Sequence, residues 1–206
     1  YSSDKMQLTA NGYEGVYDAA DHYATATASV EGAKVEYSID GEAWSEQAPS
    51  IRDVGEQAYS VRATADGYDA KTATVTLKVA PAAVKVTAVD GSKEFGAEEP
   101  PLSYRVNGHA VSGETEAFDG SVEREPGERV GTYAIGQGSL KLADNGAFKA
   151  SNYELKFVEG EFEIYSSDKM QLTANGYEGV YDAADHYATA TASVEGAKVE
   201  YSIDGE

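Results

Sequence analysis

An exact internal repeat constrains this sequence more than any other feature. Residues 165–206 reproduce residues 1–42 letter for letter, at an offset of 164 positions. Self-similarity at a fixed period is the signature of a repeat array, in which each unit contacts its neighbours. Surface positions tolerate most substitutions, so two copies normally diverge. The perfect identity therefore indicates recent duplication or continued copy correction, and we expect one complete repeat unit followed by the opening of the next.

Charge and cysteine content exclude several classes of function. The net charge is −20, from 36 acidic and 16 basic residues, and such a surface repels nucleic acid and anionic lipid. No apolar run approaches the roughly 18 residues of a membrane span. Cysteine is absent, which excludes disulfides, zinc–thiolate sites and cysteine nucleophiles. We expect no nucleic-acid partner, no membrane insertion in this segment and no cofactor.

The first 81 residues predict an all-β unit. Short runs rich in Val, Thr, Tyr and Ala alternate with period two and are separated by Gly and Asp, and no segment has helical periodicity with caps. In 72–79 the alternation places one face in a core and leaves Thr and Lys in water. The predicted strands are Met6–Ala10, His22–Val30, Lys34–Ile39, Ala58–Ala65 and Lys71–Val79.

The stretch from Glu36 to Trp44 predicts a hairpin. Asp40-Gly41 suits the positive φ angles of a two-residue type I′ turn, which would set Tyr37 opposite Trp44. The single tryptophan of the chain could stack on a sugar ring, so Trp44 is a candidate ligand-binding residue. A lone tryptophan in a small β unit is more often a core anchor, and we favour that interpretation.

Asp18, Asp21 and His22 form the cluster that most resembles a metal site. Carboxylate oxygens and an imidazole could hold a divalent cation. The residues lie in a predicted turn, however, where Asp commonly accepts hydrogen bonds from backbone N–H groups. We favour the structural turn and expect no metal. The same residues recur as Asp182, Asp185 and His186.

Three patterns in this unit carry a family resemblance: Tyr17-Asp18 followed by His22, the Val35–Trp44 stretch, and Gly55 followed by the Tyr59–Tyr68 run. Together they resemble the immunoglobulin-like repeats of bacterial surface proteins. Ala19 stands where that family usually has glycine. The resemblance implies a small β-sandwich and is nearly silent about a ligand.

Residues 82–164 predict a second β unit. The runs Gly131–Ile135 and Tyr153–Phe157 alternate with period two, and we expect the polar stretch Leu142–Ala150 to be a loop and the most mobile part of this unit. The residues predicted to face the core are Tyr133, Ile135, Tyr153, Leu155 and Phe157.

Six motifs of the second unit are similar to those of the MBG-type repeat of bacterial adhesins. They are Lys93-Glu-Phe-Gly96, Glu98-Glu-Pro-Pro-Leu-Ser-Tyr104, Arg124-Glu-Pro-Gly-Glu128, Val130-Gly-Thr-Tyr-Ala-Ile135, Ser151-Asn-Tyr153 and Phe162-Glu-Ile164. Phe95 stands where the family usually has tyrosine, and Glu99-Pro100-Pro101 where it has Asp-Pro. This resemblance spans essentially all of 83–164 and is the most specific in the chain.

Catalytic patterns are missing from the sequence. His109 has no recognisable nucleophile near it in sequence, and Ser112 lies in no nucleophile-elbow motif. Gly113-Glu-Thr-Glu116 could hold a cation, but a solvated charge run is the better interpretation. There is no phosphate-binding glycine loop. We expect that the protein is not an enzyme.

The junctions suggest how the units are arranged. Pro81 separates two predicted strands, and Ile164 runs directly into Tyr165, with no flexible Gly/Ser linker at either place. We expect three segments in an elongated rod: an immunoglobulin-like module at 1–81, an MBG-type module at 82–164, and the first half of a repeated module at 165–206. Two explanations remain open for that half: further chain completes it, or residues 43–80 of a neighbouring molecule do so by strand exchange.

The sequence thus predicts a structural function. A stalk or spacer of a bacterial cell-surface adhesin would be extracellular, anchored in the cell wall through a region outside this segment, and would project a distal binding domain from the cell. Its partners would be the neighbouring repeats of the same chain. The alternative is that the modules themselves bind host glycan or protein.

Overall fold

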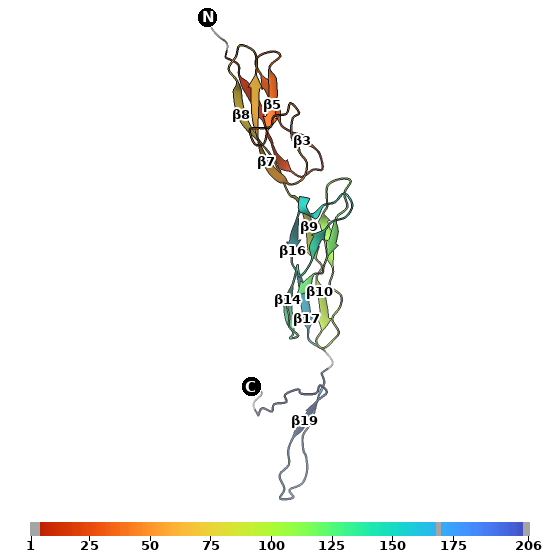
Figure 1. The fold of residues 1–206 in the computed structure, drawn as a ribbon. Helices are drawn as coiled ribbons and strands as arrows, with labels where there is room; N and C mark the ends of the chain where they lie inside the picture. The colour runs from red at the N-terminus through yellow and green to blue at the C-terminus, as the bar shows by residue number, and fades with distance from the viewer. Residues whose placement is uncertain (1–4, 168–169, 204–206) are drawn as a thin grey trace.

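The computed structural model describes residues 5–167 and 170–203, and the chain is all-β as predicted (Figure 1). Among these residues the single helix is a 3₁₀ turn, η1 (Ala150–Asn152). Across the same residues, no helix has the length and apolarity that a membrane crossing requires.

The first strand group, residues 5–80, is built on one four-stranded sheet in the order β2-β8-β7-β5. Within it β2 runs parallel to β8, and the other neighbours are antiparallel. Two small antiparallel sheets, β1-β4 and β3-β6, accompany it. The bounds are β1 Leu8–Asn11, β2 Tyr13–Val16, β3 His22–Tyr23, β4 Thr25–Ala28, β5 Lys34–Ser38, β6 Ser50–Ile51, β7 Gly55–Thr64 and β8 Lys71–Ala80.

The long hairpin of β7 and β8 supplies most of the core of this group. Val75 and Leu77 of β8 are buried while the intervening threonines face solvent, as the predicted alternation requires. Val61 of β7 and Tyr37 of β5 pack in the same cluster. Each β-branched or aromatic side chain buried in this way contributes about 1.5–3 kcal/mol to folding. Both ends of the sheet, β2 and β5, therefore depend on this hairpin.

The second strand group covers residues 82–165, and Pro81 alone separates it from the end of the first group at Ala80 (Figure 1). Its sheets are β10-β17-β14-β13, β11-β9-β16 and β12-β15, with β10 parallel to β17 and β16 parallel to β9. The bounds are β9 Ala82–Ala88, β10 Gly91–Glu94, β11 Tyr104–Gly108, β12 Ala117–Asp119, β13 Glu123–Arg124, β14 Gly131–Gly136, β15 Lys141–Ala143, β16 Tyr153–Val158 and β17 Gly160–Tyr165.

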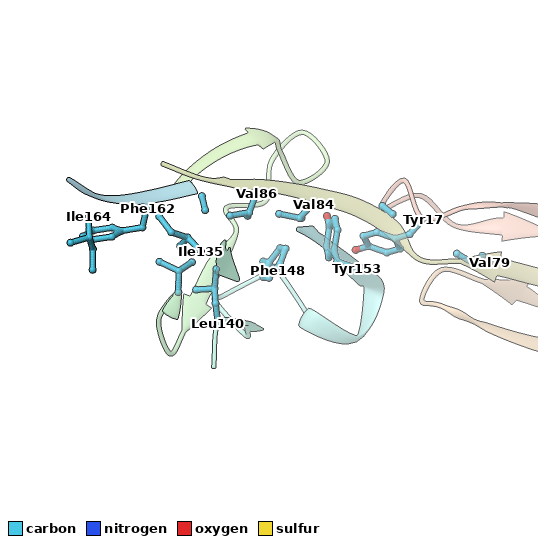
Figure 2. Close-up of a cluster of buried hydrophobic side chains, with 13 residues drawn as sticks. Tyr17, Val79, Val84, Val86, Ile135, Leu140, Phe148, Tyr153, Phe162 and Ile164 are labelled. Atoms are coloured by element: carbon cyan, nitrogen blue, oxygen red, sulfur yellow. The ribbon is translucent and has the colours of Figure 1, made fainter. Parts of the chain in front are cut away.

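One hydrophobic cluster fills the second group and reaches back into the first (Figure 2). Ile135 and Tyr153 are buried in it, as predicted, and Tyr133, Leu155 and Phe157 pack against it while partly buried. Tyr17 and Val79 of the first group belong to the same cluster. Figure 2 shows Tyr17 beside Tyr153, at the end of the cluster that faces the first group.

The predicted polar loop at 142–150 is confirmed as a loop between β15 and η1, but one of its side chains is buried. Phe148, in the middle of it, is among the largest fully buried side chains of the molecule. A short bridge between Asn145 and Phe148 forms the turn, and Asp144 accepts a hydrogen bond from the Ala150 N–H at 2.9 Å. Phe148 outweighs its polar neighbours, because burying a phenyl ring holds the loop against the core.

The predicted two-residue hairpin at Asp40-Gly41 is also wrong, by one position of register. Tyr37 pairs with Ser45, through two backbone hydrogen bonds of 2.7 and 2.9 Å. The Asp40 carboxylate accepts hydrogen bonds from the N–H groups of Glu42 and Ala43, which widens the loop. These donors hold the pKa of Asp40 below its ordinary value. A one-residue shift sends a side chain to the opposite face, so Trp44 is not a core anchor.

The second copy keeps only the local part of the fold. The strands β18 (Leu172–Asn175) and β19 (Thr189–Ala192) pair in the register of β1 and β4, with Leu172 opposite Ala192 as Leu8 is opposite Ala28. No counterpart of β2, β3 or β5 forms within residues 170–203. The end of the half module at Asp204-Gly205-Glu206 lies outside the described residues.

The two copies make the role of β8 testable with one pair of substitutions. A Cβ on Gly12 would lie well inside contact distance of the Thr76 carbonyl of β8, whereas one on the equivalent Gly176 would meet nothing. We expect Gly12→Ala to lower the free energy of unfolding by about 1–3 kcal/mol through overpacking. Gly176→Ala should leave it unchanged. Chemical denaturation of both variants measures their free energies of unfolding. Equal losses of stability would show that contact with β8 is not what makes Gly12 sensitive to substitution.

Candidate functional site

The joint between the two strand groups is the most elaborate polar site of the chain. The hydroxyl of Tyr17 donates to Glu114 Oε1 at 2.6 Å, and the hydroxyl of Tyr153 donates to Glu114 Oε2 at 2.8 Å. The two tyrosine rings meet edge to face with centroids 5.4 Å apart. One carboxylate thus ties a residue of the first group to two elements of the second, and hydrogen bonds to a charged acceptor are the stronger kind.

A second set of hydrogen bonds reinforces the joint. The buried Asn152 side chain accepts the Val54 N–H at 2.9 Å and donates to Asp53 Oδ1 at 2.8 Å. The Tyr17 N–H donates to the carbonyl of Ala80, the last residue before the junction proline. Side-chain pairing between elements almost a hundred residues apart fixes both the distance and the rotation of one group on the other.

The joint also raises the pKa values of its two tyrosines. Burial, followed by the hydrogen bond and charge of Glu114, raises the pKa of Tyr153 to about 12. Burial and the same carboxylate raise the pKa of Tyr17. Both phenols therefore remain neutral donors throughout the physiological range. The two tyrosines keep their hydrogen bonds without any change in their own protonation.

An ion-pair network lies at the opposite end of the second group. The ammonium of Lys93 is buried and contacts Glu128 at 2.6 Å and Glu99 at 2.8 Å. Arg124 contacts the same two carboxylates and lies over the ring of Phe162. Each cation is shared by two anions, which is the arrangement that compensates the desolvation of a buried charge. The network joins β10, β13 and the loops around them.

The candidate metal cluster is an internally bonded turn. Asp18 Oδ1 accepts the Ala20 N–H and contacts His22 Nε2, both at 2.9 Å. These contacts, the backbone one first, lower the pKa of Asp18, and His22 stacks on Tyr13 with centroids 3.7 Å apart. Asp21 is exposed. Within residues 5–167 and 170–203, no three His, Cys, Asp or Glu side chains converge as metal ligands would.

The same turn recurs in the second copy, with Asp182 contacting His186 at 2.9 Å and Tyr177 stacking on that ring. Ala19 and Ala183 both have φ of 63°, the left-handed region that favours glycine. Alanine therefore occupies a backbone position that favours glycine. The turn forms identically in two different surroundings, so its geometry is local.

Trp44, the candidate ligand-binding residue, is half-buried, and Arg62 occupies one face of its ring at 4.1 Å from the centroid. Its indole N–H donates to the Gly41 carbonyl at 3.1 Å. A hollow of about 250 Å³ lies on the other side of this loop, lined by Tyr37, Tyr59 and Asp40 among others but not by Trp44. A sugar on this tryptophan would have to use the face that Arg62 leaves free.

The predicted solvated charge run at Gly113–Glu116 is wrong. Glu114 belongs to the joint, and Glu116 accepts the Ala110 N–H at 3.1 Å and contacts His109 at 2.6 Å. Both acids thus have structural partners, and the exposed imidazole of His109 is held by a carboxylate alone. Ser112 is exposed in the same loop. These carboxylates can bind and orient the backbone of the loop, but the loop does not place a nucleophile beside a base.

Sequence reasoning missed the residues that matter most in these two sites. Glu114, Asn152 and Arg124 each have a partner at least 25 and up to 99 positions away, and no local pattern encodes such partners. One signal was present for the ion network. Lys93, Glu99 and Arg124 each lie within three positions of a Gly or Pro, residues that are typical of loops and turns.

The ion network predicts an acid-sensitive term in stability. Arg124, and then Lys93, lower the pKa of Glu99 from 4.5 to about 2 in the folded protein. The stabilisation is therefore complete above the unfolded pKa and is lost as the pH falls from about 4.5 towards 2. We expect Glu99→Gln to unfold more easily at neutral pH and to lose less stability over that interval. Denaturation at a series of pH values checks this, with the exposed Glu98→Gln as control; parallel curves for both variants would contradict it.

Comparison with known proteins finds one family match, which lies within the second strand group. No curated protein matches the chain. Domains of the MBG type occur in surface, adhesin-like repeat proteins and are not catalytic. Residues 84–163, from β9 to β17, match the MBG domain (YGX type).

Proposed function

We propose that this segment is a structural stalk of a bacterial cell-surface adhesin, in which MBG-type modules alternate with immunoglobulin-like modules in an elongated rod. The modules are residues 1–81 and 82–164, and residues 165–206 open the next repeat. The match of 84–163 to a domain of adhesin-like surface repeat proteins supports this. The exact repeat of 1–42 supports an array.

The joint carries the proposal. A spacer must hold its length under load, and independent beads on a flexible linker would not. Here the junction has a single proline between two strands, a core cluster that includes residues of both groups, and the hydrogen bonds of Glu114 and Asn152. Tyr181, the copy of Tyr17, is available to make the same contact with a further MBG-type module.

The stiffness of the joint can be measured directly, because the chain has no native cysteine. Fluorophores at Asp66→Cys and Glu98→Cys, two exposed loop positions in different groups, report their separation by single-molecule energy transfer. We expect one narrow distribution. Tyr17→Ala combined with Glu114→Ala should broaden it, because the joint loses both its ring contact and its shared carboxylate.

The exposed Ser112→Ala in the same loop is the matched control and should leave the distribution narrow. A broad distribution in the unmodified joint would contradict the stalk, since the modules would then move independently.

Display at the cell surface is the second part of the proposal. An antibody raised against residues 1–164 should label intact cells of the producing bacterium, and protease added outside should remove the label. Labelling that requires permeabilised cells would contradict an extracellular stalk.

Ligand binding by the modules is the alternative function, and the hollow beside Tyr37 and Tyr59, which adjoins the Trp44 loop, is one observation in its favour. Its volume of about 250 Å³ lies below the usual 300–1,000 Å³ of small-molecule sites. A glycan-array signal that Trp44→Ala or Tyr59→Ala abolishes would favour this alternative over the spacer.

A further inference from the structure

The first and last strands of the second group run side by side in the same direction (Figure 1). The chain enters this group through β9, directly after Pro81, and leaves it through β17, which ends at Tyr165. β9 is parallel to β16 over six residue pairs, of which Ala82 with Tyr153 is the first. β10 is parallel to β17 over four pairs, of which Glu94 with Tyr165 is the last. Two parallel ladders therefore join the entering segment to the leaving segment.

The direction of these strands decides how the ladders respond to tension. When the chain is pulled at both ends, the force on β9 and β10 points towards their N-termini. The force on β16 and β17 points towards their C-termini. Parallel strands then slide along each other, so the hydrogen bonds of a ladder share the load. An antiparallel terminal pair would open from one end, with one bond loaded at a time. Because each hydrogen bond contributes little by itself, resistance depends on how many are loaded together.

Asp90 bridges the gap between the two ladders. It lies between β9 and β10, and its Oδ1 accepts the Glu161 N–H of β17 at 2.8 Å. The two segments also approach closely there, since a Cβ on Gly160 would lie 3.1 Å from the carbonyl oxygen of Ala88. The connection between entering and leaving segments is therefore continuous where the strands change from one sheet to the other.

The far end of the second ladder is held by further bonds. The Phe95 N–H donates to the Tyr165 carbonyl at 2.8 Å, beyond the last pair of β10 and β17. The buried ammonium of Lys93, on β10, contacts Glu99 at 2.8 Å and Glu128 at 2.6 Å. For β10 to slide past β17, these ion pairs must separate in a site that is poorly hydrated.

The first group has the same arrangement in a shorter form. The chain passes from β1 through Gly12 into β2, and it leaves the group through β8. β2 is parallel to β8 over four pairs, from Tyr13 with Leu77 onwards. The Tyr17 N–H extends this ladder by one hydrogen bond of 2.9 Å to the Ala80 carbonyl. Both groups therefore place a strand near their beginning parallel to their last strand.

We propose that each strand group is a shear clamp, a parallel pairing of its first and last segments that carries tension along the chain. The longer clamp is that of the second group, β9 and β10 against β16 and β17, with Asp90 at its centre. This inference deepens the stalk proposal and rests on it for the source and direction of the force. A stalk with such clamps keeps its length under a pull that would open the same strands from one end.

The test pulls the 206-residue chain through two pairs of introduced cysteines that share one exposed anchor, Ser166→Cys. Ala83→Cys, on the exposed face of β9, is the axial partner and loads the clamp along its strands. The exposed Ala97→Cys is the opening partner, because it follows the end of β10 that lies beside Tyr165. Optical tweezers with DNA handles on the cysteines measure the unfolding force for each pair.

We expect the axial pull to require at least about twice the force of the opening pull, because forced unfolding follows the unfolding rate and the axial barrier includes many bonds at once. Chemical denaturation of both double-cysteine variants without force is the control for stability, and it should give equal free energies of unfolding. Equal unfolding forces in the two directions would overturn the proposal.

Asp90→Ala tests the centre of the clamp. It should lower the axial force, because the Glu161 N–H loses its acceptor. It should leave the opening force unchanged, because opening begins at the other end of β10. Ser92→Ala, at an exposed position of the same strand, is the control and should change neither force. An equal loss in both directions for Asp90→Ala would contradict the clamp.

These outcomes are distinct from those of the stalk proposal. A clamp that fails this test leaves the stiffness of the joint and the display at the cell surface as they were. A flexible joint, in turn, would leave the unfolding forces of the second group unchanged, since both anchors of each pair lie within or directly after that group.

Discussion

The fold of each copy depends on pairing with the β7–β8 hairpin. β8 pairs with β2 and β7, and β7 pairs with β5, so the hairpin is the element that turns separate short strands into a sheet. Residues 170–203 supply the comparison within one chain. The nearby strands β18 and β19 still pair, because a local hairpin closes a short loop, whereas the counterparts of β2 and β5 remain without strand structure. The counterparts of β2 and β5 have no partner strand within residues 170–203, because their partners in the first copy are β8 and β7.

The same hairpin positions the joint. β8 ends at Ala80 and β9 begins at Ala82. Because one proline alone separates them, the direction of β8 determines where the second group starts. Asp53 and Val54 lie directly before β7, and they meet Asn152 in the turn that precedes β16. Tyr17 lies directly after β2, the strand beside β8. On the side of the first group, each contact of the joint is therefore held at the end of an element that β7 or β8 has fixed.

Sequence reasoning predicted the strands well and their partners poorly. Period-two alternation located β8 and the buried face of β14, because burial of one face of a sheet imposes that pattern locally. The register of Tyr37 could not be predicted, because the Asp40 carboxylate draws two backbone N–H groups into a wider loop. Phe148 was missed because one apolar residue makes no periodic pattern. Glu114 and Arg124 were missed because their partners are distant in sequence, and the family motifs mark their neighbours without assigning the pairs.

Short-range contacts, and not the strong negative charge, must set the geometry of an array of these units. Charges on neighbouring modules are screened beyond about 8 Å at physiological ionic strength, so repulsion keeps chains soluble but orients nothing across a module. The basic residues Lys93 and Arg124 are also enclosed by carboxylates, which leaves the outer surface still more uniformly acidic. A uniform field favours no particular angle between modules. The rotation of one module on the next then rests on the directional hydrogen bonds of Glu114 and Asn152 and on the packing of Tyr17 against Tyr153. Salt screens these contacts little, because they are partly buried. The angle between modules in an array should therefore not change with ionic strength.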